Sequence, residues 1–167
     1  CDALVSAWLA LLLSGSAQRS RRLWAMAFAA LALGAFLGGT WHGFLRHELL
    51  WKATLLCVGV ASFGMVAGSS FATLAGHGLI WLASVKLVVF AAWVAWRNEF
   101  IAVIADTAVA FPLVLALHLW RFNGWLVAGV LVSVLAALAQ ASGFALHRHF
   151  NHNDLYHVIQ MFGLWLF

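Results

Sequence analysis

The chain has 167 residues, of which 65% are hydrophobic and only 8% are charged, and its formal net charge is +4. A water-soluble domain carries roughly a quarter of its residues as charged side chains, so this composition excludes an ordinary soluble fold and predicts an integral membrane protein. The nine Lys and Arg residues are scattered along the chain, which excludes nucleic acid as a partner.

Seven apolar segments follow one another along the chain. Segments this long and continuous predict helices, because a helix satisfies its own backbone hydrogen bonds in lipid. A span needs about 20 apolar residues, so the first segment, at 3–13, and the last, from 155 onward, are interpreted as truncated spans. The complete spans are predicted at 23–44, 53–71, 78–96, 100–119 and 125–146. Because the connections are short, we predict that 1–167 form a single transmembrane helical domain, an all-α bundle of seven helices.

The order of the spans assigns each connection to one of two faces. We define the near face as the one that carries the first connection, with Arg19, Arg21 and Arg22, and the far face as the opposite one. Lys and Arg residues in the connections are divided equally between the faces, so only the cluster in the first connection indicates that the near face is cytoplasmic. The far face is then extracytoplasmic. It receives six of the eight histidines: His42, His47, His147, His149, His152 and His157.

The second predicted span carries small residues on one side. Gly34, Gly38 and His42 follow one another at steps of four and therefore share one helical face. Small residues at this spacing let helices approach closely in a bilayer, so we expect His42 to face the inside of the bundle. The alternative is an interfacial histidine that hydrogen-bonds to water or to a backbone carbonyl.

The seventh span opens with a pattern typical of a helix start. Asn151 or Asn153 can cap the helix, and Asp154 in the first turn suits the helix dipole. Asp154 and His157 are three residues apart, hence neighbours on one face, and a carboxylate beside a histidine can orient it or join it as a metal ligand. The alternative is a dipole partner beside an ordinary interfacial histidine. The preceding connection can also bind metal loosely as a solvated loop, through His147, His149 and His152.

Lys86 lies near the middle of the fourth predicted span. A central lysine costs about 2.5–3.5 kcal/mol on insertion scales, so it requires a partner. The fourth and fifth spans form an antiparallel hairpin, and Asp106 of the fifth span lies at a depth that the lysine side chain can reach. We therefore predict an ion pair or water-linked pair between Lys86 and Asp106. The alternative is that Lys86 reaches into a hydrated cavity.

Tryptophan residues recur at the ends of the predicted spans. Aromatic residues of this kind are enriched where a membrane meets water. We therefore expect the following residues to be interfacial anchors: Trp41, Trp51, Trp96, Trp120 and Trp125.

The layout of spans and histidines resembles the membrane hydrolase superfamily of alkaline ceramidases and adiponectin-receptor-like proteins. In that superfamily three histidines hold a zinc ion, and the bound water cleaves an amide or ester bond of a lipid. His42 matches the ligand in the second span, and His157 matches the second histidine of the HxxxH motif that opens the seventh. The first histidine of that motif falls on Asn153, one residue after His152.

Two further positions depart from the pattern of the superfamily. Its serine, four residues before the second-span histidine, corresponds to Gly38, and its third-span aspartate corresponds to Ala53. The resemblance nevertheless implies a zinc-dependent lipid amide or ester hydrolase, with membrane lipid as partner and substrate. The implied metal ligands are His42, His157 and either His152 or Asp154. Glu48 or Asp154 is the implied general base.

Two other classes of function stay open. One is a non-enzymatic integral membrane subunit or small transporter. The other is a membrane electron carrier that binds haem through facing histidines, either His42 with His157 or His77 with His118.

Overall fold

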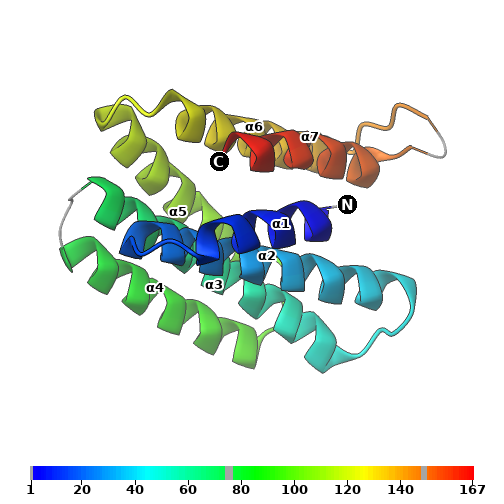
Figure 1. The fold of residues 1–167 in the computed structure, drawn as a ribbon. Coiled ribbons are helices and arrows are strands. Elements are labelled where there is room, and N and C mark those ends of the chain that lie inside the picture. Colours follow the sequence, from blue (N-terminus) through cyan, green and yellow to red (C-terminus); the bar gives the residue numbers. More distant parts are fainter. Residues whose placement is uncertain (1, 74–76, 148–149) are drawn as a thin grey trace.

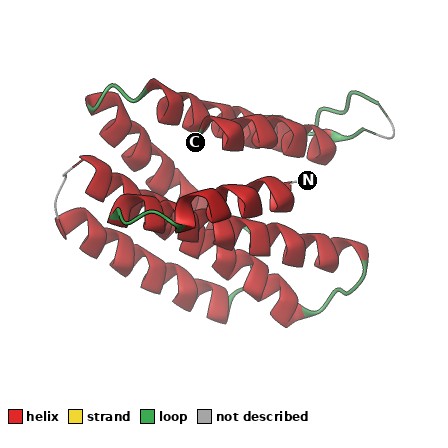
Figure 2. Cartoon of the chain, in the orientation of Figure 1, coloured by secondary structure: helices red, strands yellow, loops and turns green. Residues whose placement is uncertain are grey.

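The computed structural model describes residues 2–73, 77–147 and 150–167, apart from the side chain of Asn153. These residues form seven α-helices and no named strand, which confirms the all-α prediction (Figure 2). The helices are α1 (Asp2–Ser14), α2 (Arg19–Gly43), α3 (Glu48–Thr73), α4 (His77–Trp96), α5 (Ile101–Trp120), α6 (Gly124–Ser142) and α7 (His152–Leu166).

Five of the helices, α2 to α6, are long and apolar enough to cross a membrane, judged by length and composition alone. Two predicted boundaries differ from the structure for physical reasons. Helix α3 begins at Glu48 rather than at 53, because an ion pair of 2.8 Å between Glu48 and Lys52 lies along its first turns. Helix α6 ends at Ser142 rather than at 146, because Gly143 adopts a left-handed conformation with φ of 67°.

Helix α3 occupies the centre of the bundle and packs against α2, α4 and α5 (Figure 1). Helix α1 packs on α2, and α7 packs on α6 and also touches α1. Of the five long helices α3 is the most buried, whereas α4 lies at the periphery and is the most exposed. Helices α2, α4 and α5 therefore surround α3, and α6 with α7 forms a hairpin along one side.

Small residues set the close approach of α2 to α3. A Cβ added to Gly64 would lie 2.8 Å from the carbonyl oxygen of Leu23 and 3.0 Å from the Cβ of Ala27. Gly34 and Gly38 of α2 are also buried, and an added Cβ would meet α3 at 3.1 and 3.2 Å. The glycine stripe of the second span thus packs against a neighbouring helix, as predicted.

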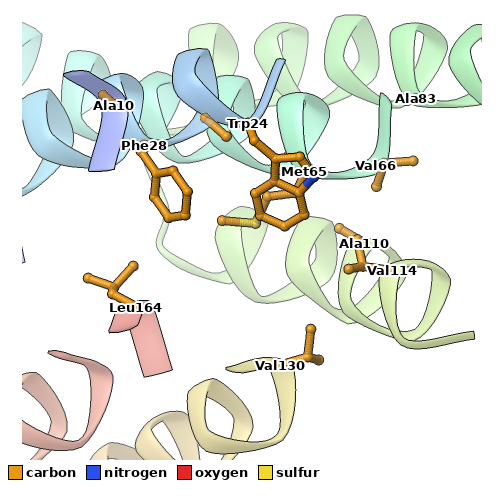
Figure 3. Packing of buried hydrophobic residues seen from close by; sticks show 11 residues of the cluster. Ala10, Trp24, Phe28, Met65, Val66, Ala83, Ala110, Val114, Val130 and Leu164 are labelled. Atoms are coloured by element: carbon orange, nitrogen blue, oxygen red, sulfur yellow. The ribbon is translucent and has the colours of Figure 1, made fainter. Parts of the chain in front are cut away.

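A hydrophobic cluster joins helices that are distant in sequence (Figure 3). Trp24 and Phe28 of α2 pack with Met65 of α3, and the cluster extends to Val130 of α6 and Leu164 of α7. Burial of this kind normally drives a soluble fold. Here large apolar side chains also cover the outside, especially on α4, where Trp81 is 73% exposed and Val88 is 68% exposed.

Candidate functional site

A lysine, an aspartate and a serine meet between α3, α4 and α5. Lys86 Nζ donates a hydrogen bond of 2.6 Å to Ser62 Oγ and a second hydrogen bond to the carboxylate of Asp106. The predicted ion pair between Lys86 and Asp106 is confirmed. We call Ser62, Lys86 and Asp106 the polar centre.

The polar centre is almost closed to the surroundings of the bundle. The side chain of Asp106 is 1% exposed and that of Lys86 is 12% exposed. Within the part of the chain that the structure describes, Asp106 Oδ2 is buried and has no hydrogen-bond partner. Because an unsatisfied buried oxygen is costly, and more so on a charged group, this atom marks a place where the protein tolerates an unfavourable arrangement.

A second polar pair lies on the same two helices, α3 and α5. His118 Nε2 and Ser69 Oγ are 3.0 Å apart, and both residues are buried. From the sequence, His118 was predicted only as a possible haem ligand, and its pairing with Ser69 was not predicted. A signal was present, because Asp106, Ala110, Val114 and His118 follow one another at steps of four and occupy one face of α5. All four are buried.

His42 lies at the edge of the bundle. Its side chain is exposed, and its ring packs against Trp41 at 4.8 Å and Trp51 at 6.1 Å between ring centroids. The glycine stripe faces α3, and the His42 ring also meets α3 through Trp51, but the His42 side chain stays exposed at the end of the bundle. The inward orientation predicted for His42 is therefore wrong.

His157 has a carboxylate partner from the opposite end of the sequence. His157 Nδ1 lies 2.5 Å from Asp2 Oδ2 at the start of α1. Asp154, the predicted neighbour, instead accepts a hydrogen bond of 3.0 Å from the backbone of Asn151, whose side chain accepts one of 3.3 Å in return. This reciprocal cap favours the alternative reading of Asp154 as a helix-start residue.

The described residues of the predicted metal site do not come together in one place. Glu48 is exposed and paired with Lys52, and His152 is half-buried. In the described segments the backbones of α2 and α7, which carry His42 and His157, do not pack closely against each other. The two helices share side-chain contacts through the hydrophobic cluster that contains Phe28 and Leu164. Among the described residues no group of three or more His, Cys, Asp and Glu side chains is arranged to hold a metal ion. His149 and the side chain of Asn153 lie outside the described residues.

Comparison with known proteins identifies a family. No curated protein and no solved structure matches the sequence significantly. The model of a family of unknown function, DUF6962, matches residues 3–167. Because this match spans nearly the whole chain, the protein belongs to the family DUF6962.

Proposed function

We propose that the chain is an integral membrane protein and that it works as a small transporter of an ion or a charged solute. Helices α2 to α6 are its long membrane spans, α1 and α7 complete a set of seven, and the far face is extracytoplasmic. The length and composition of the five long helices support the membrane assignment. Large apolar side chains on the outside of α4 support it too, because lipid can cover them.

The single observation that carries the transport proposal is the buried pair between Lys86 and Asp106. Ionisable residues inside a membrane span are costly and commonly mark pathways for ions or substrates. A purely stabilising role is a weaker explanation, because apolar residues of similar volume often hold helices together equally well. The oxygen of Asp106 that has no partner in the described part of the chain adds to this, because an unsatisfied buried polar atom is costly and calls for an explanation other than stability.

Charge movement across a bilayer tests this proposal. The purified protein is reconstituted into liposomes, and currents on a solid-supported membrane are recorded during jumps in proton, sodium, potassium or chloride concentration. The double variant Lys86→Met with Asp106→Leu removes the pair without leaving an isolated charge. We expect current from the wild type and at least a tenfold smaller current from the double variant.

A matched control uses the exposed pair of Arg97 and Glu99, which are 3.2 Å apart with side chains about half exposed. The variant Arg97→Gln with Glu99→Gln removes two charges outside the polar centre and is expected to keep the wild-type current. A wild type without current in any gradient, or a double variant with full current, would refute the transport proposal.

The zinc hydrolase remains a second candidate because of one specific observation. His157 presents Nδ1 to Asp2, which leaves Nε2 as the ring nitrogen that could bind a metal ion. Metal-bound histidines usually place their other ring nitrogen on a carboxylate or carbonyl in this way. His157 would hold zinc together with His42 and either His152 or Asp154, and these residues would first have to approach one another.

Metal analysis of protein purified without a histidine tag tests the second candidate. The hydrolase requires bound zinc in the wild type and its loss in both His42→Ala and His157→Ala. A wild type without zinc, or two variants that retain it, would remove this candidate. An absorbance spectrum of the same preparation tests the haem alternative.

A further inference from the structure

Helices α3 and α5 pack against each other and run in the same direction, from the far face to the near face (Figure 1). Each contributes one member to each polar pair along their contact. Toward the far face, Ser62 of α3 and Asp106 of α5 both accept hydrogen bonds from Lys86. Toward the near face, Ser69 of α3 and His118 of α5 share a hydrogen bond. At 1.5 Å per residue, the two positions on α5 are about 18 Å apart along the helix.

An apolar layer separates the two pairs. Ala110 and Val114 lie between Asp106 and His118 on the buried face of α5, and Val66 lies between the serines on α3. These three side chains are at most 1% exposed. The contact between α3 and α5 therefore has a titratable group on each side of an apolar barrier, and ionisable residues inside membrane spans commonly belong to proton relays.

We propose that the proton is the ion that this protein moves, and that the imidazole of His118 is a second proton-binding station on the near-face side of the barrier. This inference rests on the proposed transport function and specifies its ion. Asp106 Oδ2 is an acceptor without a partner among the residues that the structure describes, so one proton can bind there without displacing a hydrogen bond. The imidazole of His118 can take up a proton at one ring nitrogen and release it from the other.

The burial of both stations favours a proton over a larger ion. Asp106 and His118 are 5% and 2% exposed, and a proton needs no cavity at its binding site. Sodium or chloride would need several oxygen or nitrogen ligands around an open volume. The groups that face the two stations are Lys86 from α4 and Ser62 from α3 at Asp106, and Ser69 from α3 at His118. Each proton bound adds one positive charge to its station, and its release restores the original state.

A structural role for His118 would be a hydrogen bond that holds α3 to α5, as polar residues commonly do between membrane helices. The variant His118→Gln separates the two roles. A glutamine amide occupies the position of Nε2 and can keep the bond to Ser69 Oγ, but it cannot carry a proton at neutral pH. Ser69→Ala makes the opposite change, because it removes the hydrogen bond and keeps the imidazole.

The experiment measures proton uptake into liposomes that contain the pH-sensitive dye pyranine, driven by a potassium diffusion potential. We expect His118→Gln to reduce the proton flux at least tenfold while its thermal midpoint stays within a few degrees of the wild type. Ser69→Ala should lower the midpoint and retain most of the flux. His77→Gln is the control, because His77 is an exposed histidine at the same end of the bundle. His118→Asn replaces the glutamine variant if the latter does not fold. Its shorter amide corresponds to Nδ1 and loses the bond to Ser69, so its flux is compared with that of Ser69→Ala, which lacks the same bond and keeps the imidazole.

Two results would overturn this inference. One is a glutamine or asparagine variant with the proton flux of the wild type, which would leave His118 as a structural residue. The other is a wild type that carries current in gradients of sodium, potassium or chloride but not of protons. The second result would remove the proton while leaving the transport proposal in place, whereas the absence of any current would refute the transport proposal itself.

Discussion

The pair of Lys86 and Asp106 allows the loss of one partner to be compared with the loss of both. Lys86→Met leaves a carboxylate whose side chain is 1% exposed and also removes the hydrogen bond to Ser62. Removing one partner of a buried pair costs about 3–5 kcal/mol of folding free energy. This corresponds to a decrease of about two to three and a half orders of magnitude in the folding equilibrium constant.

The two single variants should differ in cost. Asp106→Leu leaves a lysine that is already 12% exposed and has a long, flexible stem, so its ammonium group can turn toward water or lipid headgroups. The aspartate left by Lys86→Met is short and fixed to a buried face of α5. We therefore expect Lys86→Met to cost more than Asp106→Leu. The double variant should fall within about 1 kcal/mol of the wild type, since apolar replacement of a whole pair is often neutral.

Unfolding in mixed micelles measures these differences. Sodium dodecyl sulfate is titrated into protein held in lipid–detergent bicelles, and circular dichroism follows the loss of helix. The exposed pair of Arg97 and Glu99 is the control, and its removal should change the unfolding free energy by less than about 1 kcal/mol. Two results would contradict the burial of the pair in the folded protein. One is a double variant with an unfolding free energy as low as that of Lys86→Met. The other is a smaller loss of unfolding free energy in Lys86→Met than in the control.

Three further predictions concern packing, capping and depth. Gly64→Ala should cost about 1–3 kcal/mol in the same unfolding assay because its new Cβ meets the backbone of α2. Gly39→Ala should be neutral or stabilising, because its added Cβ meets nothing within 4 Å among the described residues. Asn151→Ala should cost about 0.5–2 kcal/mol and raise amide hydrogen exchange in the first turn of α7, with no change in α4. Single-Trp variants that keep Trp96 or Trp120 should be quenched most by lipids brominated near the headgroups. Strongest quenching by lipids brominated at the chain ends would contradict the anchor assignment.

Composition, together with the depth of each polar residue along its predicted span, was sufficient to predict much of the fold. Apolar segments of sufficient length predicted helices at nearly the right places, and counting residues from the turn between α4 and α5 predicted the partner of Lys86. Helix ends were harder, because they depend on single residues: Gly143 ends α6 before its apolar run ends, and Glu48 extends α3 beyond its apolar run.

The far-face histidines show the limit of sequence reasoning. Span order places His42 and His157 at the same end of the bundle, but it does not say which helices are neighbours. The partner of His157 is Asp2, because α7 packs beside α1 rather than beside α2. Periodicity constrains which face of a helix is apolar, whereas neighbour relations depend on how all seven helices pack together.

The contact between Asp2 and His157 also has a consequence for how the chain is made. The two residues are separated by 155 positions, so they join the first helix to the last. A ribosome adds about 5–20 residues per second, so His157 is synthesised roughly 8–31 s after Asp2. During that interval α1 has no α7 to pack against, and its first turn presents an aspartate with no histidine beside it. Asp2 and His157 can therefore come together only after synthesis has passed His157.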